Sequence, residues 1–243
     1  MHRLLVESVL LDEGSPVLPA AAARHLKVLR PKDGEEIELF DGHGKWRVYS
    51  YSSGQETASP LRAQSNIRTI EQSNNSLTLF ACVTKGSRWD WTVEKATELG
   101  VTRIVPVISE RTIVRIPKGE RAAKRERWMR IAEDAARQSD AKWLPEILEA
   151  VDFKDALPLV KETVCFIGAL TTPPSPPLVR AIEQSNNRTI EHFSVFIGPE
   201  GDFTPEELAA LMEIATPTSF GPTILRAETA AIYAVSVLRS LLI

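Results

Sequence analysis

The chain has 243 residues, of which 43% are hydrophobic and 25% are charged, and its formal net charge is −3. This is ordinary globular composition, so a chain that is disordered, collagen-like or coiled-coil throughout is excluded. The length suits two domains, since domains commonly have roughly 100–150 residues. No stretch of the sequence approaches the roughly 20 consecutive apolar residues that cross a bilayer.

The N-terminus and the cysteines bear on where the protein works. Glu7 interrupts the first apolar residues too early to leave a signal-peptide core. Cys82 and Cys165 both lie in apolar runs that are typical of strands, which favours buried, reduced thiols. We therefore expect a cytoplasmic protein with no membrane partner.

Positive charge is concentrated in the middle of the sequence. Residues 74–147 carry 14 basic and 10 acidic side chains, whereas residues 148–243 carry 6 and 12. The run 111–130 holds eight basic groups against two acids. Such a local excess can bind phosphates even on an acidic protein, and the alternative is a solvated helix face. The eight are Arg111, Arg115, Lys118, Arg121, Lys124, Arg125, Arg127 and Arg130.

The first 60 residues are rich in predicted β-structure. The pattern predicts a short helix over Ala20–Leu29 that stops before Pro31. Loose alternation predicts strands at 35–40 and 46–51, and the sequence Asp-Gly-His-Gly between them predicts a hairpin turn. Short strands with one small helix favour a compact barrel. We expect an accessory binding domain over residues 1–73.

A change in composition marks the end of this domain. Residues 64–76 are polar and include the string RTIEQSNN, and a closely similar string, EQSNNRTIE, occurs at 183–191. The two copies are too short to be a domain duplication. We interpret both as polar insertions in surface loops, the first of them at the domain boundary.

From residue 76 onward, predicted strands and helices alternate. This order is typical of a mostly parallel α/β sheet with helices on both faces, and we assign it to residues 74–243. A capping box, in which Thr204 precedes Pro205 and Glu207, marks one helix start. The predicted strands are 77–84, 103–108, 164–170 and 193–197, and the predicted helices are 89–99, 118–139, 204–214 and 227–242.

Several common catalytic motifs are missing from the sequence. No Gly-x-Gly-x-x-Gly follows a predicted strand, and neither a Walker P-loop nor a Gly-x-Ser-x-Gly elbow occurs. The four histidines and two cysteines show no metal-ligand spacing. We therefore expect no nucleotide hydrolysis, no catalytic triad and no metal site.

The candidate ligand-binding and catalytic residues are concentrated at two strand-to-helix junctions. At 196–203, Gly198 and Gly201 allow the backbone to approach a ligand closely, and Pro199 stiffens the turn. This loop follows a strand, where open α/β sheets bind ligands. As a motif by itself, the loop is equally consistent with an ordinary turn.

The second junction, at 219–231, places a cation where the helix dipole disfavours it. Gly221 and Pro222 precede apolar residues, and Arg226 then stands at the start of a helix. Arg226 therefore needs a further reason to be present. One alternative is a surface ion pair with Glu228 or another acid.

Five motifs in order resemble those of the RsmE-type RNA methyltransferases of the SPOUT superfamily. The resemblance extends from about residue 3 to residue 240. The motifs are HLKVLR at 25–30, KGSR at 85–88, EKATELGV at 94–101, IGPEG at 197–201 and ILRAETA at 224–230. One segment departs from the family pattern, because residues 136–143 read ARQSDAKW where the family has a glutamate before Gln-Ser and an arginine soon after.

The resemblance implies both an architecture and an activity. The fold class is α/β, with a SPOUT-type trefoil-knot methyltransferase domain over 74–243 preceded by a small PUA-like β-barrel that binds RNA. The implied methyl donor is S-adenosylmethionine, and the implied acceptor is N3 of a uridine in 16S ribosomal RNA, free or in the 30S subunit. The family also implies a homodimer.

The resemblance also assigns residues to the cofactor. It places the cofactor against three loops, at 168–171, 198–201 and 220–226. In the second loop, Glu200 is a candidate acceptor of hydrogen bonds from the adenosine ribose or amine. The implied cofactor-binding residues are Gly168, Leu170, Thr171, Ile197, Gly198, Pro199, Glu200, Gly201, Phe220, Gly221, Ile224 and Leu225.

For catalysis, we predict that Arg226 stabilises negative charge on the uracil imide, because a fixed cation beside the oxygens favours the anion. Glu228 is our second catalytic candidate, and Glu98 or water are alternatives as the proton acceptor. Lys95 has the alternative of pairing with Glu98 on its own helix. The predicted RNA-binding residues are His25, Arg30, Lys85, Arg88, Lys95, Arg121, Lys124 and Arg125.

Two other functions remain open from the sequence. A ribose 2′-O methyltransferase of the same superfamily would share the fold and the cofactor but would act through a hydroxyl group. A non-catalytic RNA-binding or ribosome-assembly protein would explain the barrel and the basic run, but it would give the two Gly-Pro loops no purpose.

Overall fold

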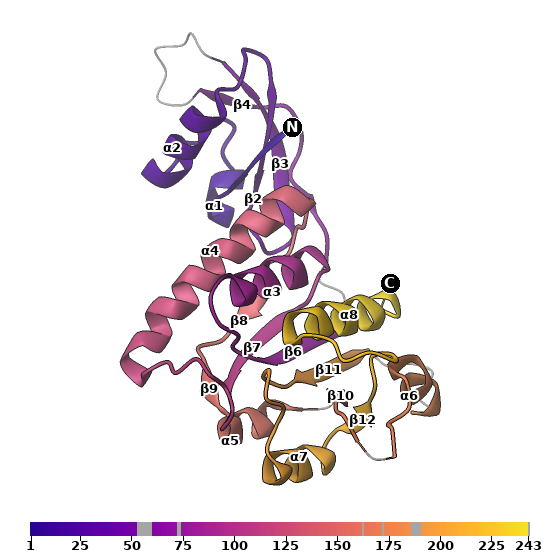
Figure 1. The fold of residues 1–243 in the computed structure, drawn as a ribbon. Coiled ribbons are helices and arrows are strands. Elements are labelled where there is room, and N and C mark those ends of the chain that lie inside the picture. The colour runs from indigo at the N-terminus through magenta and orange to yellow at the C-terminus, as the bar shows by residue number, and fades with distance from the viewer. Residues whose placement is uncertain (53–59, 72–73, 162, 172, 186–190, 243) are drawn as a thin grey trace. The chain divides into compact units, whose positions relative to one another are not determined.

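The computed structural model, drawn in Figure 1, describes residues 1–52, 60–71, 74–161, 163–171, 173–185 and 191–242. The chain divides into two compact units, unit 1 with residues 1–72 and 133–144, and unit 2 with residues 73–132 and 145–243. The division expected from the sequence, 1–73 and 74–243, places the boundary one residue later and assigns 133–144 to the second domain. The second polar repeat lies largely outside the described residues.

Unit 1 is built on a mixed five-stranded sheet. Its strands follow the order β1-β2-β3-β4, with β5 also paired to β3. The pair β1–β2 is parallel, and the pairs that β3 forms with β2, β4 and β5 are antiparallel. The elements are β1 (His2–Leu5), α1 (Ser8–Leu11), α2 (Ala20–Leu29), β2 (Glu36–Phe40), β3 (Lys45–Tyr51), β4 (Leu61–Ala63) and β5 (Arg68–Thr69).

The predicted helix and hairpin of unit 1 are confirmed. Helix α2 has the predicted bounds, and β2 and β3 pair across the predicted turn. In that turn, Asp41 Oδ1 accepts hydrogen bonds from the backbone N–H of His43 (2.7 Å) and of Lys45 (3.0 Å). Gly44 has φ +89, and a Cβ atom there would lie 2.4 Å from the carbonyl oxygen of Ile70, so only glycine fits.

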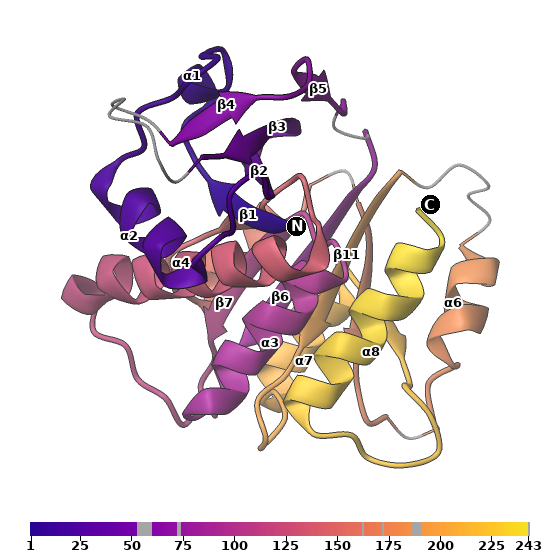
Figure 2. The ribbon, with the colours of Figure 1, turned by 90° about the horizontal axis from the view of Figure 1, so that it is seen from above.

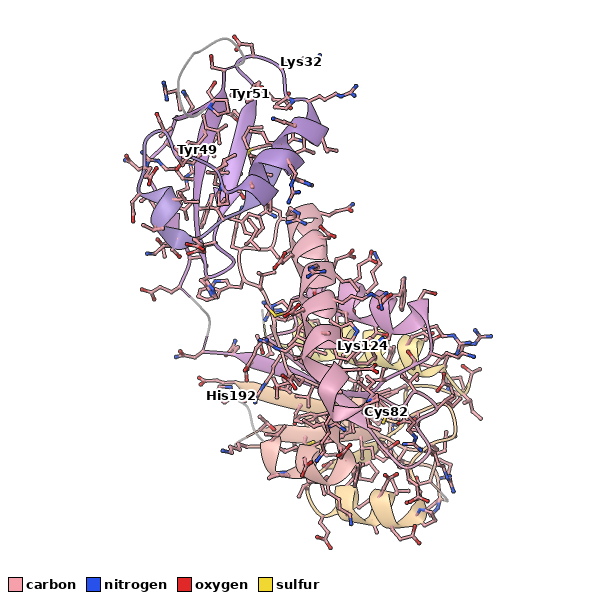
Figure 3. All side chains as sticks on the ribbon, turned by 90° about the vertical axis from the view of Figure 1, so that its left-hand side faces the viewer. Lys32, Tyr49, Tyr51, Cys82, Lys124 and His192 are labelled. Carbon is pink, nitrogen blue, oxygen red and sulfur yellow. The ribbon has the colours of Figure 1, made fainter. Side chains whose placement is uncertain are left out.

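The core of unit 1 lies between its sheet and its helices. Leu4, Leu39 and Leu61 are fully or almost fully buried there, together with Tyr49, which Figure 3 labels on β3. The Tyr49 hydroxyl lies 3.1 Å from the carbonyl oxygen of Glu13, and burial raises the pKa of this phenol. The hydroxyl therefore stays protonated and donates this hydrogen bond.

A buried arginine ties the segment 133–144 to unit 1. The Arg3 side chain lies against Phe40 at 4.2 Å from the ring centre, and its Nε is 2.7 Å from Glu38 Oε1. Its guanidinium donates to the carbonyl oxygens of Ala136 and Ala141. These carbonyls belong to the end of a helix and the residues after it, so Arg3 satisfies acceptors that the helix itself leaves open.

Charged side chains around this arginine complete the network. Lys142 Nζ lies 2.6 Å from Glu38 and 2.8 Å from Asp140. Burial alone raises the pKa of Asp140, but the hydrogen bond and charge of Lys142 and the charge of Arg3 outweigh it, so the net pKa is below the ordinary value. The segment that departs from the family pattern is thus held by charges that unit 1 supplies.

Unit 2 is built on a parallel sheet. The strand order is β12-β10-β11-β6-β7-β8, with β9 also paired to β7, and every pairing is parallel. The elements from β6 onward, of which α4 belongs to unit 2 up to residue 132 and to unit 1 from residue 133, are β6 (Ser76–Cys82), α3 (Ser87–Glu98), β7 (Arg103–Ile108), η1 (Lys118–Glu120), α4 (Arg121–Ser139), β8 (Glu146–Ile147), β9 (Val151–Asp152), α5 (Phe153–Ala156), η2 (Leu157–Leu159), β10 (Val164–Gly168), α6 (Leu178–Gln184), β11 (His192–Ile197), α7 (Pro205–Met212), β12 (Thr216–Thr218) and α8 (Ala227–Ser240).

Helices cover both faces of this sheet, as the sequence predicted. Because side chains alternate along a strand, Leu77 and Leu79 of β6 join a core with α3 and α8, while Phe80 and Cys82 join a second core with α5 and α7. Figure 1 and Figure 2 show α3 and α8 side by side on one face and α7 on the other. On the second face Phe80 stacks on Phe196, with ring centres 4.4 Å apart.

The predicted elements of unit 2 are found, with ends shifted by a few residues, and several short ones were not predicted. The capping box is present, because Thr204 accepts from the Glu207 N–H and Glu207 accepts from the Thr204 N–H. The unpredicted elements include α6 and β12. Both cysteines are free and buried, as expected, and burial raises the pKa of each thiol to about 11.

Every helix among the described residues is too short or too polar to cross a bilayer. The same residues contain no group of three or more histidine, cysteine, aspartate or glutamate side chains that could hold a metal ion.

The Arg3 network yields a prediction about stability. Arg3→Ala leaves carbonyl oxygens without a donor and Glu38 with one cation fewer, so we expect a loss of about 3–5 kcal/mol in the free energy of unfolding. Chemical denaturation followed by circular dichroism measures this loss. The control is Arg130→Ala, whose pair with Glu126 is exposed on both sides (75% and 68%) and contributes about 1 kcal/mol or less. Equal losses for the two variants would contradict the prediction.

Candidate functional site

Three neighbouring strands of unit 2 end at the same edge of the sheet. Strand β10 pairs with β11 on one side and with β12 on the other, so that Ile167 lies opposite Phe196 and Gly168 lies opposite Thr218. The loops that follow these strands surround a cavity of about 310 Å³. The carboxyl ends of parallel strands are the usual place for a ligand in an open α/β sheet, and this volume is typical of a small-molecule site.

The first loop depends on a glycine. A Cβ atom at Gly168 would lie 2.3 Å from Cε2 of Phe220, a residue of the third loop. The Phe220 ring in turn packs against Tyr233 of α8, with ring centres 5.6 Å apart. Gly168 therefore allows an aromatic ring to lie directly on the end of β10. Leu170, two residues further on, lies on the cavity wall and is 65% exposed.

The second loop carries two carboxylates to the wall, Glu200 and Asp202. Asp202 has φ +58, which is uncommon for a residue other than glycine, and its side chain accepts a hydrogen bond from the N–H of Phe203 (2.8 Å). The Glu200 carboxylate lies 3.2 Å from the Arg88 guanidinium at the start of α3. The wall therefore carries two negative side chains, and one of them, Glu200, forms an ion pair with Arg88.

The third loop leads from β12 into α8. Gly221 has φ +130, a conformation that other residues rarely adopt. Ile224 lies on the cavity wall and is 79% exposed. Arg226 is the N-cap residue of α8 and is also on the wall. The cavity thus combines exposed apolar side chains, two carboxylates and one arginine.

Of the two predicted catalytic residues, one lines the cavity and the other does not. Arg226 is exposed and lies on the wall, and among the described residues its side chain has no ion pair or hydrogen bond. Glu228 is not on the wall, whereas Ala230 is. Residues two apart on a helix point in roughly opposite directions, so Glu228 faces away from the cavity side of α8. One oxygen of Glu228 is buried without a hydrogen-bond partner in the described structure.

Ten of the twelve predicted cofactor residues line the cavity, and two do not. The Thr171 hydroxyl instead contacts the carbonyl oxygen of Pro173 and the hydroxyl of Ser175. The Gly201 carbonyl accepts a hydrogen bond from Arg111. The ten on the wall are Gly168, Leu170, Ile197, Gly198, Pro199, Glu200, Phe220, Gly221, Ile224 and Leu225.

Sequence reasoning missed further wall residues. Asp202 directly follows the predicted motif at 197–201, and its position next to that motif was the available signal. Thr218 belongs to β12, a three-residue strand with a proline in the middle, which carries no clear strand signal. The wall residues outside the predicted cofactor loops are Asp202, Thr218, Ser219, Ala227 and Ala230, whereas Ala169 and Thr223 line the wall within the predicted loops 168–171 and 220–226.

Four of the predicted RNA-binding cations already have partners within the protein. Arg88 pairs with Glu200, and Arg121 pairs with Asp152 at 2.6 Å. Arg125 donates to the carbonyl oxygen of Ile147 at 2.7 Å. Lys95 lies 2.8 Å from both Glu94 and Glu98, and these hydrogen bonds raise its pKa. For Lys95 the structure therefore shows the alternative interpretation, an ion pair with Glu98 on its own helix.

The other four predicted RNA-binding residues have no such partner. Within the described part of the chain, no hydrogen bond or ion pair involves the side chains of His25, Arg30, Lys85 or Lys124. Lys85 and Arg30 are exposed, and His25 and Lys124 are half-buried. Figure 3 labels Lys124 on α4. His25 and Arg30 belong to α2 and its C-cap, and α2 has Leu26 as its buried residue and no acid among its ten residues.

The family comparisons agree with the two-part organisation. A family described as the RNA methyltransferase domain matches residues 71–239, and one described as the RNA methyltransferase PUA domain matches residues 18–56. The first match covers the cavity and all three of its loops. The second covers α2 and the hairpin of unit 1.

Two curated relatives share one name. Ribosomal RNA small subunit methyltransferase E of Synechocystis is 31% identical, with 99% of this chain and 78% of that protein covered. The protein of the same name from Aquifex aeolicus is 34% identical, with 91% and 93% covered.

Solved structures show the same fold. Ribosomal RNA small subunit methyltransferase E from Neisseria gonorrhoeae, bound to S-adenosylmethionine, is 28% identical, with a TM-score of 0.82 over 99% of this chain and 98% of that one. Lpg2936 of Legionella pneumophila, in complex with the same cofactor, is also 28% identical, with a TM-score of 0.82 over 98% and 96%.

The contact between Gly168 and Phe220 yields a second prediction. In Gly168→Ala the new methyl group must displace the Phe220 ring, and we expect a loss of about 1–3 kcal/mol in the free energy of unfolding. Gly119→Ala is the matched control, since a Cβ atom there meets nothing within 4 Å and the φ is not positive. Thermal and chemical denaturation of both variants measure the difference. A Gly168→Ala variant as stable as its control would refute the close packing.

Proposed function

Because the chain belongs to the family of the ribosomal RNA small subunit methyltransferases E, we propose that its cavity binds S-adenosylmethionine and that the enzyme methylates N3 of a uridine in 16S ribosomal RNA. The observation that carries the proposal is the cavity at the ends of β10, β11 and β12, with Arg226 on its wall. The bound cofactor in two relatives of the same fold supports it.

The wall residues suit the chemical groups of this cofactor. Leu170 and Ile224 expose apolar surface that a flat adenine ring can cover. The carboxylates of Glu200 and Asp202 can accept hydrogen bonds from ribose hydroxyls or an amine and favour a positively charged ligand. When bound, S-adenosylmethionine supplies a methyl group on a positively charged sulfur.

Arg226 is the residue that we assign to the reacting base. The imide of uracil is a weak acid, and its anion carries negative charge on O2 and O4. A guanidinium beside those oxygens stabilises the charge as it develops. Arg226 has no acid partner in the described structure, so its charge is not already neutralised there. Since Glu228 lies off the wall, we assign the imide proton to water.

RNA binding is proposed for cations that the fold leaves free. In unit 1, α2 carries the cations Arg24 and Lys27 beside His25 and ends at Arg30, with no acid in the helix. In unit 2, Lys85 and Lys124 have no partner among the described side chains. Unneutralised cations of this kind bind phosphates with little regard to base sequence.

The resemblance to the family extends the proposal in four ways. It supports a homodimer, a trefoil knot in unit 2, a substrate that is either free 16S ribosomal RNA or the 30S subunit, and a location in the cytoplasm, where ribosomal RNA is modified.

The deciding experiment is methylation of ribosomal RNA and of 30S particles with labelled S-adenosylmethionine. Digestion and mass analysis then locate the methyl group. A label on N3 of one uridine supports the proposal, and a label on a ribose 2′-oxygen assigns the enzyme to the other chemistry. Calorimetry that shows no S-adenosylmethionine binding would favour a non-catalytic RNA-binding protein.

Arg226 can be tested by substitution. We expect Arg226→Ala to lower the single-turnover rate at saturating cofactor by about 10²–10³, the usual effect of removing one preorganised donor. Arg226→Lys should recover only part of the rate, because an ammonium lacks the planar geometry of a guanidinium. Arg180→Ala is the control, since Arg180 is also exposed in unit 2 but lies off the cavity wall. A normal rate in Arg226→Ala would show that Arg226 is not catalytic.

The RNA surface of unit 1 is tested by salt dependence. We expect the double variant Arg24→Glu, Lys27→Glu to bind ribosomal RNA more weakly. The plot of log affinity against log salt should flatten by about 0.7–0.9 for each phosphate that the protein no longer neutralises. Lys154→Glu, an exposed lysine of α5 in unit 2, is the control. If the double variant and the control have the same slope as the wild type, α2 does not bind phosphate.

A further inference from the structure

The residues that follow β7 hold the second cavity loop. Strand β7 is not a neighbour of β11, because β6 lies between them in the sheet. Arg111, three residues after the end of β7, nevertheless donates from Nη1 to the carbonyl oxygen of Gly201 (3.0 Å) and to that of Phe203 (3.3 Å). One guanidinium group therefore fixes the backbone on both sides of Asp202.

A second contact joins the same two segments. The carboxylate of Glu207, which is only 9% exposed, accepts from the N–H of Glu110 (2.9 Å) and from the N–H of Thr204 (3.1 Å). The backbone next to Arg111 is thus tied to the start of α7, immediately after the loop. The stem of Arg111 also lies close to Gly201, since a Cβ atom there would be 3.6 Å from Cβ of Arg111.

Asp202 is the residue that most needs this support. Its φ of +58 lies in the left-handed region, which costs energy for any residue with a side chain. Such a conformation persists only where the surroundings determine it. Arg111 provides this by binding the carbonyl groups one residue before and one residue after Asp202. Asp202 and Glu200 both stand on the cavity wall, and Arg111 itself does not.

We propose that Arg111 is a positioning residue for the cofactor: it holds the backbone of residues 201–203 in the shape that places Glu200 and Asp202 on the cavity wall. The inference rests on the proposed function, because it assumes that the cavity binds S-adenosylmethionine. It changes the interpretation of the basic run, in which Arg111 is one of eight cations for which the sequence left phosphate binding and a solvated helix face as alternatives. The Arg111 guanidinium donates its hydrogen bonds to two carbonyl groups of the protein.

The test is calorimetric titration of S-adenosylmethionine into wild type and Arg111→Met, without RNA. Methionine keeps an apolar stem on Gly201 and removes the donors. We expect the dissociation constant to rise about tenfold or more, since hydrogen bonds from a charged donor have effects of this order. Arg115→Met is the matched control: Arg115 belongs to the same loop and donates to the carbonyl oxygens of Ser109 and Glu110, but not to the cavity loop. The affinity of Arg115→Met should change by less than about twofold, because Arg115 donates no hydrogen bond to the cavity loop and substitutions away from such contacts have small effects.

Hydrogen exchange of the cofactor-free protein gives a second readout. In Arg111→Met the amides of residues 198 and 200–204 should exchange several-fold faster than in wild type, while those of α3 and α8 keep their rates. If Arg111→Met does not fold, Arg111→Lys takes its place, with the same expected directions and smaller changes.

The outcomes separate this inference from the proposed function. If wild type does not bind S-adenosylmethionine, the proposed function fails, and the exchange rates alone decide whether Arg111 holds the loop. If wild type binds and the Arg111 variant has the same affinity and exchange rates, the inference is overturned. A variant that loses RNA affinity with unchanged cofactor affinity would also overturn the inference, and it would show that Arg111 binds RNA.

Discussion

The parallel pairing of β10 with both β11 and β12 is the constraint on which the site depends. Parallel strands place their carboxyl ends at one edge, so loops that lie up to about fifty residues apart in the sequence meet around one cavity. The packing allows this only with a residue that has no side chain at the end of β10. Gly168 leaves room for Phe220, and Phe220 carries the third loop back onto the sheet.

The distribution of charge follows from what each cation already contacts. A run of eight basic residues suggests one phosphate-binding surface, yet several of its members hold the protein itself together. Arg121 pairs with Asp152, Arg125 binds the carbonyl oxygen of Ile147, and Arg111 binds two carbonyls of a cavity loop. An acidic partner offsets the positive charge of a cation, and a carbonyl partner occupies N–H donors that a phosphate would otherwise accept from. The proposed RNA contacts therefore rest on α2, Lys85 and Lys124.

Buried charge has a different role in unit 1. Arg3 and Glu38 are both almost inaccessible, and each is costly to bury without a partner. Their pairing, with Lys142 and the open carbonyls after α4, attaches a distant segment to the first unit. This is the segment in which the sequence departs from the family pattern. The charged residues Asp140 and Lys142 of this segment pair with Arg3 and Glu38 of unit 1. These pairs are not part of the family pattern.

Local signals in the sequence determined much of this protein. Helix α2, the hairpin turn with its two glycines, the capping box at Thr204 and the glycine-containing loops on either side of the cavity all depend on residues close together in the chain. Their physical causes, such as a fixed φ or a side chain that bonds a nearby N–H, act over a few residues and can be recognised in one sequence.

Only the tertiary structure decided which charges are free and which residues face the cavity. The partners of Arg88, Arg111 and Arg3 lie 112, 90 and 35 positions away, and no local pattern records such a pairing. Glu228 lies in the same motif as Arg226, but its position on helix α8 directs its side chain away from the cavity wall. Strand β12 is too short to show a period, and it exists because β10 offers it an unpaired edge. Contacts that depend on folding the whole chain can be found only after the chain has folded.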